Sequence, residues 1–470
     1  MNYTIKFGTD GWREIIANQY TVQNVIRVTE ATAQWLVKQH TKPSVSIGYD
    51  CRFGGRMFAE YTAACFAHHG IKVFLSDSFV TTPMLSLANT KLKTQLGVVI
   101  TASHNPASYN GYKLKADYGG PLLPGKVAEI ERLIPPSATQ NFKSLHEYAE
   151  EDLFESCNME KLYIEHVTQH FNLSQIHEIS SGLVYDAMYG AGQSVVKKIL
   201  PNAHLLHCSL NPSFNGIPPE PILKNLKELS GLIEYTHGLQ FGLATDGDAD
   251  RIGFFDSKGQ FIDSHHLILL VMNYLVQYKK MSGAVVKSFS VSNKVERLAS
   301  KLGLKTITTQ IGFKYICEYM VQEDVLIGAE ESGGIAIKGH IPERDGIWIG
   351  LTLLEYMAVT GKSIEELIQE IYSMVGPFAV ERYDLSISQS LKDEIINNCK
   401  NQHYTAFGGY KVLSVDNMDG YKFHLPGDEW VMIRPSGTEP VLRVYAESFD
   451  SKSAYAILDA VKDTILQATS

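Results

Sequence analysis

Short apolar runs alternate with amphipathic segments along most of this 470-residue chain. Residues 21–40 carry apolar side chains at helical spacing, and the compact apolar run at 44–49 has the length of a strand. This alternation of strands and helices predicts parallel or mixed sheets covered by helices. The strands expected up to residue 375 are 44–49, 71–75, 98–100, 183–185, 241–245, 252–255, 284–289, 305–309 and 325–328, and the helices are 21–40, 56–69, 82–89, 193–200, 266–278, 294–302, 313–320, 347–358 and 364–374.

The pattern changes after about residue 376, where strands 382–387, 430–433 and 441–447, a meander over 411–423 and two helices follow one another. This order is typical of a smaller α+β domain. The predicted fold class is therefore three successive mixed α/β domains of similar topology, followed by a C-terminal α+β domain. A Pro-containing stretch at 134–137 is expected to lead into a helical connector that ends near His170. The expected boundaries are 1–145, 146–256, 257–375 and 376–470.

Composition and charge exclude several classes of function. The chain is 44% hydrophobic and 20% charged, with a net charge of −9 that argues against nucleic-acid and anionic-membrane surfaces. It has no apolar stretch of transmembrane length, and its first residues lack a signal-peptide pattern. The 6 cysteines are far apart, with no C-x-x-C pair. They predict reduced, mostly buried thiols in a cytoplasmic protein, without disulfides or a zinc site.

Ser103 and His104 follow the apolar strand 98–100, in the sequence TASHNP. Pro106 disfavours a helical residue before it, so the pair is expected on an exposed bend at the end of a core strand. A polar loop on a rigid strand is a suitable position for a nucleophile. Taken alone, the stretch is interpreted as a strand–turn with a capping serine.

Asp246, Asp248 and Asp250 alternate in the sequence DGDADR, so their carboxylates can converge on one hard cation such as Mg²⁺. An EF-hand is excluded because Arg251 occupies the required glycine position and Ser257 that of the bidentate glutamate. A solvated acidic turn is an equally good interpretation of an isolated D-x-D-x-D. The guanidinium of Arg251 beside the acids would suit a phosphoryl group.

Two further loops and a lysine are weak signals when each is considered alone. Arg434-Pro-Ser-Gly-Thr438 offers a guanidinium, hydroxyls and backbone amides that can hold a phosphate, but it also suits a simple turn. Glu330-Glu-Ser332 offers acceptors for sugar hydroxyls, or is a polar strand end. Lys113 lies on the expected return strand after Ser103, where a surface lysine is the usual interpretation.

The combination and order of these loops decide the interpretation. TASHNP, DGDADR, GAEESGG and RPSGTEP follow one another at about one per expected domain, and FGTDGWR precedes them. This arrangement resembles the α-D-phosphohexomutase superfamily, in which four domains surround a central cleft and each contributes one loop. The resemblance covers essentially the whole chain and is specific for the superfamily, but much less so for the sugar.

The resemblance implies a role for each matching residue. Ser103 would carry a phosphoryl group, with His104 beside it, and one Mg²⁺ would bind Asp246, Asp248, Asp250 and Ser103. Lys113 or His104 would transfer protons, because Arg344, which stands where animal-type phosphoglucomutases have a lysine, is a poor general base. The other implied contacts are Arg13 and Arg251 with the transferring phosphoryl group, Glu330 and Ser332 with sugar hydroxyls, Arg344 with the substrate, and Arg434, Ser436, Gly437 and Thr438 with the non-reacting phosphate.

The implied reaction interconverts glucose 1-phosphate and glucose 6-phosphate, with glucose 1,6-bisphosphate as intermediate and activator. Mannose phosphate, alone or alongside glucose phosphate, is the alternative substrate, and glucosamine phosphate is less favoured. A sugar phosphatase using the same serine and Mg²⁺, and a catalytically silent sugar-phosphate-binding homologue, are the alternatives from other classes. The expected partners are small hexose phosphates, with no nucleic acid and no membrane, for a cytoplasmic monomer or homodimer.

Overall fold

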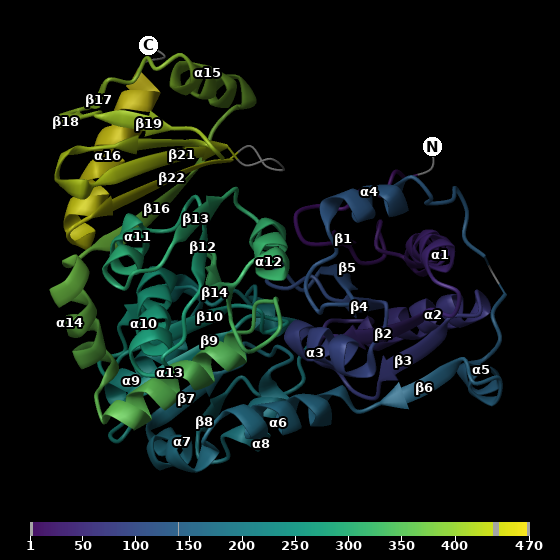
Figure 1. Ribbon diagram of the computed structural model, residues 1–470. Helices are drawn as coiled ribbons and strands as arrows, with labels where there is room; N and C mark the ends of the chain where they lie inside the picture. Colours follow the sequence, from purple (N-terminus) through teal and green to yellow (C-terminus); the bar gives the residue numbers. More distant parts are fainter. Residues whose placement is uncertain (1–2, 140, 436–440, 468–470) are drawn as a thin grey trace. The chain divides into compact units, whose positions relative to one another are not determined.

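The computed structural model describes residues 3–139, 141–435 and 441–467 (Figure 1). The chain divides into two compact units. Unit 1 comprises residues 1–284 and 312–364, and unit 2 comprises residues 285–311 and 365–470. All of the predicted site residues except those of the 434–438 loop lie in unit 1.

Unit 1 begins with a six-stranded mixed sheet in the order β1-β5-β4-β2-β3-β6. Strands β2, β3, β4 and β6 are parallel, and β5 returns antiparallel to β4 and carries β1 at the edge. The loop between β4 and β5 holds Ser103, so the predicted nucleophile follows a strand in the interior of the sheet. The strands are β1 (Trp12–Ile15), β2 (Ser44–Tyr49), β3 (Lys72–Ser76), β4 (Leu96–Ile100), β5 (Tyr109–Ala116) and β6 (Phe154–Cys157).

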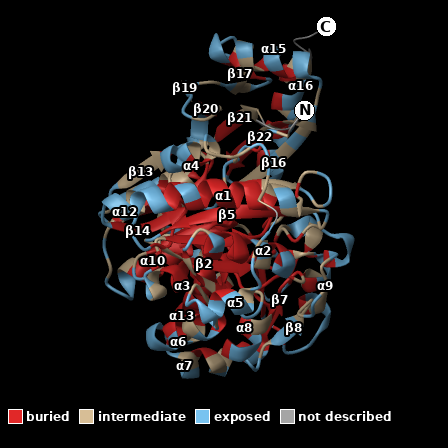
Figure 2. Cartoon of the chain, turned by 90° about the vertical axis from the view of Figure 1, so that its right-hand side faces the viewer, coloured by how far each residue is buried: buried red, intermediate tan, exposed pale blue. Residues whose placement is uncertain are grey.

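Side chains that alternate along β2 pack against helices on both faces of the sheet. Val45 and Ile47 belong to the core cluster shared with α1 (Val22–Gln39) and α2 (Gly55–His68). On the other face, Ser46 donates a 2.8 Å hydrogen bond to Asn89 of α3 (Thr82–Leu92). Successive side chains of a strand point to opposite faces, so both faces of β2 are buried, as Figure 2 shows by its red colour.

A second sheet of unit 1 has the order β11-β10-β9-β7-β8. Strands β7, β8 and β9 are parallel, whereas β10 pairs antiparallel with β9 with Ile252 opposite Thr245. Residues 246–251 are therefore a hairpin loop that turns the three aspartates back on one another. The strands are β7 (Leu183–Asp186), β8 (His204–Leu206), β9 (Phe241–Thr245), β10 (Ile252–Phe255) and β11 (Phe261–Ile262), and the helices of this region are α6 (Met159–His170), α7 (Leu173–Ile179), α8 (Gln193–Ile199), α9 (Lys227–Tyr235) and α10 (Ser264–Gln277).

Unit 1 ends with the antiparallel pair β14 (Val325–Ala329) and β15 (Ile335–Ile337), whose connecting turn is residues 330–334. Helix α12 (Phe313–Gln322) precedes this pair and α13 (Gly346–Thr360) follows it. Asp345 caps α13 by accepting the Trp348 N–H at 2.9 Å. The cap fixes where the helix begins and thereby where Arg344 enters the site.

Unit 2 contains β13 (Thr306–Thr309) and, from Val285 on, its parallel partner β12 (Ala284–Ser288), with α11 (Asn293–Lys301) between them in sequence. Helix α14 (Ile364–Val375) leads to an antiparallel sheet in the order β16-β22-β21-β20-β19. Helices α15 (Gln389–Lys400) and α16 (Ser451–Gln467) contribute Ile395 and Ile457 to the core of this sheet. The strands are β16 (Ala379–Ser386), β19 (Ser414–Asp416), β20 (Tyr421–His424), β21 (Trp430–Pro435) and β22 (Val441–Ser448).

The predicted fold class is confirmed. Short elements that the sequence analysis did not predict are β1, β8, β11, β15, α4 (Pro124–Glu131) and α9. The connector after residue 137 also differs from its prediction. The connector was expected to be helical as far as His170, but it contains the short strand β6, which extends the first sheet by pairing with β3. Its sequence Phe-Glu-Ser-Cys carries little periodic signal, and only the open edge of β3 makes it a strand. No described helix is long and apolar enough to cross a membrane. The four domain boundaries stay predictions.

Candidate active site

Ser103 is buried at the centre of the site, with 1% of its surface exposed. The expected exposed bend is therefore wrong for Ser103, because the aspartate loop packs against it, and His104 is half-buried. Its Oγ donates a 2.7 Å hydrogen bond to Oδ2 of Asp246, and Nδ1 of His104 lies 3.5 Å from the same Oγ. The Ser103 backbone is left-handed, with φ of 52°, an uncommon conformation for a residue with a side chain. The structure thus brings together the predicted nucleophile and an aspartate 143 positions further along the chain.

The three alternating aspartates converge as predicted. Asp246, Asp248 and Asp250 are fully buried, and one carboxylate oxygen of each lies within 4.8 Å of the others. Burial, then the charges of Asp250 and Asp248, raise the pKa of Asp246 well above its ordinary value. A cluster of buried carboxylates in this arrangement needs positive charge close by.

Lys113 supplies part of that charge. From β5, its Nζ lies 2.8 Å from Oδ2 of Asp248, 3.2 Å from Oδ2 of Asp250 and 2.8 Å from Oδ2 of Asp10. Burial works to lower the pKa of the Lys113 ammonium, but the three carboxylates outweigh it and the pKa is raised. The lysine is therefore no surface residue: it is a buried, charged bridge between the first sheet and the aspartate loop.

Arg344 is a second buried bridge. Its Nη2 lies 2.7 Å from Asp250 and 2.8 Å from Asp10, and its guanidinium carbon lies 5.2 Å from the centre of the Phe313 ring. Burial opposes the charged guanidinium, yet Asp250 and Asp10 raise its pKa well above the ordinary value. Predicted as a substrate contact, Arg344 is bound here to carboxylates of the protein itself.

Glu330 and Ser332 lie in the turn between β14 and β15. Glu330 accepts the Gly312 N–H at 3.1 Å, and its Oε2 lies 3.7 Å from Nη1 of Arg344. Burial raises the pKa of Glu330 to about 7, although Arg344 acts in the opposite direction. Ser332 is half-buried on the same turn. A carboxyl and a hydroxyl are thus held at the edge of the charged cluster, where each can bind a hydroxyl group.

Arg13 and Arg251, the other two predicted cations of unit 1, contact the Ser103 loop and Glu220 respectively. Arg13 donates to the side chain of Asn105 at 2.8 Å, and Arg251 Nη1 lies 3.5 Å from Glu220. Burial, together with Arg251 and Arg13, lowers the pKa of His104 well below its ordinary value. The histidine is thereby neutral at neutral pH.

Of the predicted phosphate loop, the structure describes Arg434, whose Nε donates to Asp419 at 3.1 Å within unit 2. Ser436, Gly437 and Thr438 lie outside the described residues. The predicted role of this loop stays a prediction.

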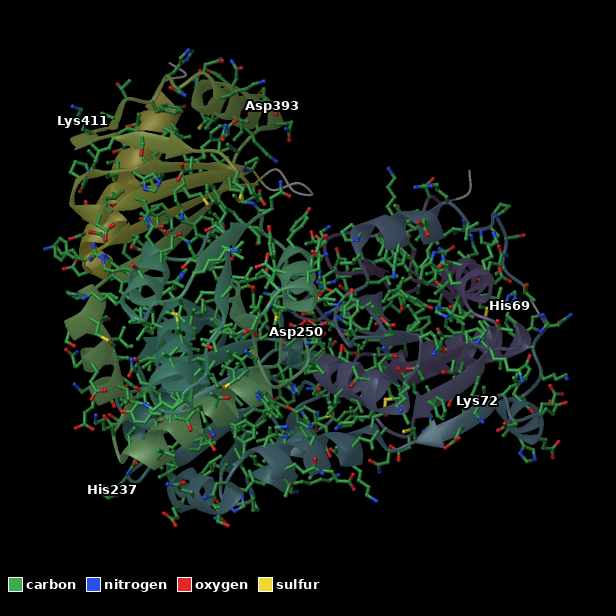
Figure 3. The ribbon with its side chains drawn as sticks, in the orientation of Figure 1. His69, Lys72, His237, Asp250, Asp393 and Lys411 are labelled. Atoms are coloured by element: carbon green, nitrogen blue, oxygen red, sulfur yellow. The ribbon has the colours of Figure 1, made fainter. Side chains whose placement is uncertain are left out.

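The aspartate cluster fits a divalent cation. Oδ1 of Asp248 and Oδ1 of Asp250 are buried and have no hydrogen-bond partner in the described structure, while their Oδ2 atoms bind Lys113. Orphaned buried carboxylate oxygens are costly unless a cation or a donor satisfies them. Hard oxygen donors of this kind suit Mg²⁺, and Figure 3 labels Asp250 among the packed side chains of unit 1.

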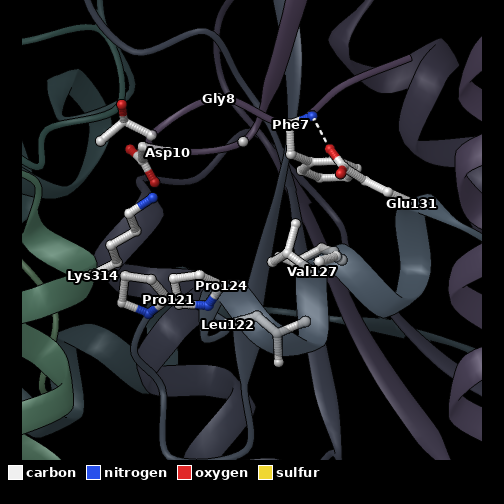
Figure 4. A pocket seen from close by; sticks show the side chains of 13 residues that line it. Phe7, Gly8, Asp10, Pro121, Leu122, Pro124, Val127, Glu131 and Lys314 are labelled. Carbon is white, nitrogen blue, oxygen red and sulfur yellow. Dashed lines mark hydrogen bonds between the residues drawn. The ribbon is translucent and has the colours of Figure 1, made fainter. Parts of the chain in front are cut away.

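A cavity of about 130 Å³ lies beside Asp10, lined by the N-terminal loop, by the region around Pro121 and Pro124, and by Lys314 (Figure 4). On its apolar side it is bordered by Phe7, Leu122 and Val127. Asp10 lines this cavity and also bridges Lys113 and Arg344. The charged cluster is therefore adjacent to an open space within unit 1.

Sequence reasoning missed Asp10, although it stands in the quoted FGTDGWR segment. It also missed the ion pair between Lys115 and Glu343, both fully buried, and Thr82, whose hydroxyl donates to Asp248 at 2.5 Å. A polar residue directly after a Gly-rich turn was a usable signal for Asp10. Neither Thr82 nor the Lys115–Glu343 pair had a local signal, because their partners are more than a hundred residues away.

Comparison with known families accounts for this arrangement. Four models of the phosphoglucomutase/phosphomannomutase family match in order: alpha/beta/alpha domain I at residues 4–140, domain II at 161–259, domain III at 263–375 and the C-terminal domain at 411–464. The fold and the matched domains define an enzyme that transfers a phosphoryl group within its substrate, an intramolecular phosphotransferase. The chain belongs to the phosphoglucomutase/phosphomannomutase family, that is, to the α-D-phosphohexomutases.

Individual relatives resemble the chain over nearly its full length. A Thermus thermophilus protein assigned as a phosphomannomutase is 32% identical, with a TM-score of 0.87, over 99% of this chain and 100% of the other. The phosphoglucomutase/phosphomannomutase of Thermococcus kodakarensis is 28% identical over 96% of each chain. The phosphoglucosamine mutase of Heliobacterium modesticaldum is 28% identical over 97% of this chain and 98% of its own.

Proposed function

We propose that the protein interconverts glucose 1-phosphate and glucose 6-phosphate through a phosphorylated Ser103 and a glucose 1,6-bisphosphate intermediate. The observation that carries the proposal is the 2.7 Å hydrogen bond between Ser103 Oγ and Asp246, within a cluster of buried aspartates. A nucleophile beside a cation site and several fixed positive charges suits phosphoryl transfer, because catalysis of that reaction rests on positioning and charge stabilisation.

In the proposed cycle, the free hydroxyl oxygen of the hexose phosphate attacks the phosphorus carried by Ser103. The bond from phosphorus to Ser103 Oγ breaks, a bond to the sugar oxygen forms, and the hydroxyl proton passes to a base. The bisphosphate then turns around, and its other phosphoryl group returns to Ser103 by the reverse exchange. Of the two predicted proton-transfer groups, His104 is held neutral 3.5 Å from Ser103 and can accept this proton. Lys113, charged and bound to the aspartates, can donate one in the reverse exchange.

Asp246, Asp248 and Asp250 would hold one Mg²⁺, together with an oxygen at Ser103. When bound, Mg²⁺ supplies positive charge that stabilises the oxygens around the transferring phosphorus. Arg13 and Arg251 would balance the remaining phosphoryl charge. Burial of Ser103 keeps water away from the phosphoryl group, and thus favours transfer to the sugar over hydrolysis.

The choice of sugar rests on the Glu330–Ser332 turn. The carboxyl of Glu330 and the hydroxyl of Ser332 suit two neighbouring sugar hydroxyls, with the non-reacting phosphate bound by Arg434 and residues 436–438. Relatives named for phosphoglucomutase, phosphomannomutase and phosphoglucosamine mutase activities make mannose 1-phosphate and glucosamine 1-phosphate the competing substrates. We propose that the enzyme is cytoplasmic and is a monomer or homodimer. Sedimentation of the purified protein tests the oligomeric state.

The deciding experiment measures glucose 6-phosphate formed from glucose 1-phosphate with Mg²⁺ and a trace of glucose 1,6-bisphosphate. Turnover of mannose 1-phosphate and of glucosamine 1-phosphate is measured in parallel assays. Ser103→Ala should abolish turnover, whereas the matched control Ser78→Ala, an exposed serine, should retain it. Fast turnover of mannose or glucosamine phosphate with slow glucose turnover would refute the sugar assignment. Release of inorganic phosphate faster than isomerisation would indicate a phosphatase. No turnover by phosphorylated protein would indicate a silent binding protein.

A further inference from the structure

Arg52 surrounds the backbone of the Ser103 loop with hydrogen bonds. It lies three residues after the end of β2, and 3% of its surface is exposed. Its Nη2 donates to the carbonyl oxygens of Ser103 at 2.5 Å and Asn105 at 2.6 Å. Its Nη1 donates to those of Pro106 at 2.8 Å and Tyr109 at 3.1 Å. One guanidinium therefore binds nearly the whole turn that connects β4 to β5.

Asp50 and Thr101 complete this support from the same edge of the sheet. Oδ2 of Asp50 lies 3.2 Å from Nε of Arg52 and accepts the Thr101 hydroxyl at 2.5 Å. The same Thr101 oxygen accepts the backbone N–H of Ser103 at 2.9 Å. Both the N–H and the carbonyl of Ser103 are thus bound by side chains of one buried network.

The guanidinium of Arg52 also packs against Phe214. The guanidinium carbon of Arg52 lies 4.8 Å from the centre of the Phe214 ring, and that ring is buried. A guanidinium over an aromatic face is attracted by the ring and shielded from water. Arg52 is therefore fixed between the loop that it binds and the Phe214 ring.

The conformation that this network holds is an unfavourable one. Ser103 has a φ of 52°, and strained backbone of this kind persists only where its surroundings over-determine it. In that conformation Ser103 Oγ points at Asp246. A relaxed loop would move the oxygen away from the aspartate cluster, and a displacement of about 1 Å can cost a reaction about 100-fold in rate.

We propose that Arg52 and Thr101 are positioning residues, which hold Ser103 in its strained conformation so that its Oγ faces the aspartate cluster. The inference rests on the proposed role of Ser103 as phosphoryl carrier. The segment Asp50-Cys51-Arg52, which follows the end of β2, would thus take part in the reaction. None of its side chains needs to touch the substrate. The effect should fall on kcat and leave substrate binding nearly unchanged.

The test compares Arg52→Lys with Arg56→Lys, which changes an exposed arginine of the same segment, 71% of whose side chain is accessible. Lysine keeps the charge at position 52 but lacks the planar fork that reaches four carbonyls. We expect Arg52→Lys to lower kcat about 100-fold, with KM within about two-fold of wild type, and Arg56→Lys to change neither. Hydrogen exchange of the peptide 101–110 should become faster in Arg52→Lys alone.

Thr101→Val and Thr101→Ser provide a second pair, because valine matches the shape of threonine and serine restores its hydroxyl. We expect kcat to fall about ten-fold in Thr101→Val and to recover in Thr101→Ser. If Arg52→Lys fails to fold, the two Thr101 variants provide the test instead. Equal kcat in Thr101→Val and Thr101→Ser would then overturn the inference. A folded Arg52→Lys enzyme with wild-type kcat and wild-type exchange of the loop also overturns it. Absence of turnover in the wild type would instead refute the proposed function, and the exchange of the loop would still report on Arg52.

Discussion

A β-carbon on Gly334 would lie 2.4 Å from Cδ of Arg344. That separation is far below van der Waals contact, so the space that a side chain at 334 would need is filled by the arginine. Only a glycine there lets Arg344 cross the turn to Asp10 and Asp250. The predicted sugar loop thus also determines where a buried cation of the site lies.

We expect Gly334→Ala to lower kcat/KM about 100-fold, because the displaced Arg344 no longer reaches Asp10 and Asp250. The backbone at 334 is not left-handed, so the added methyl acts only through the contact. In an Arg344→Ala background the same substitution should have little further effect, which a double-mutant cycle on kcat/KM measures. Gly125→Ala, with open space around its added methyl, is the control. Additive losses in the cycle would contradict the argument.

Mg²⁺ should raise the thermal midpoint of the wild type, since a ligand that binds only the folded state stabilises it by about 2.7 kcal/mol at 100 times Kd. Asp246→Asn should abolish this shift while leaving the bonds of Lys113 to Asp248 and Asp250 intact. Asp393→Asn, at an exposed position of α15, should behave as wild type. A chelator should remove mutase turnover, and Mg²⁺ should restore it. If Mg²⁺ raised the thermal midpoints of Asp246→Asn and Asp393→Asn equally, the aspartate cluster would be ruled out as the binding site.

Lys115→Met should destabilise unit 1 by about 3 kcal/mol, because it leaves Oε2 of the buried Glu343 without its lysine partner, while Oε1 keeps its contact with Arg344. Adding Glu343→Gln should recover part of that loss, since the buried negative charge that lost its lysine is then gone. The control is Lys161→Met, which breaks an exposed pair with Glu165 and should change stability little. Urea unfolding of the four proteins measures the differences, and equal effects of the two lysine substitutions would be the contrary result.

His207 should make the stability of unit 1 depend on pH. Its Nδ1 lies 3.0 Å from Oδ1 of Asp186, and the hydrogen bond to Asp186, opposed by burial, raises the pKa of His207 above 6.5. A histidine whose pKa is higher in the folded than in the unfolded protein stabilises the fold when it is protonated. This stabilisation is complete below the pKa of the unfolded state and is lost as the pH rises through the pKa of the folded state. The stability difference between wild type and His207→Gln should therefore be larger below about pH 6 than above about pH 9.

Urea midpoints across that pH range check the prediction for His207. The matched control is His237→Gln, at an exposed histidine labelled in Figure 3. A difference between wild type and His207→Gln that stays constant with pH would show that the imidazolium contributes nothing to folding.

The sequence by itself determined the order of strands and helices and the loops that carry the chemistry. Residues 98–103 and 241–250 show why: an apolar run followed by polar turn residues is a local pattern, and a strand followed by a turn leaves that pattern in the sequence. The burial of Ser103 and of the three aspartates left no such local signal. The alternation of Asp246, Asp248 and Asp250 is equally local, so the convergence of their carboxylates could be predicted from spacing. The connector that contains β6 was not, because its four residues become a strand only beside β3.

Only the tertiary structure decided which charges meet. Lys113 and Asp248 are 135 positions apart, and no local pattern relates a lysine of β5 to a hairpin loop of another sheet. No local pattern relates Arg344 to Asp10, 334 positions away, either. Nor does one relate Arg52 to the four carbonyl oxygens that accept its hydrogen bonds. Such pairs form because burial removes water from each charge and leaves an opposite charge or a carbonyl as its partner. Composition and spacing select the kinds of residue, and packing selects their partners.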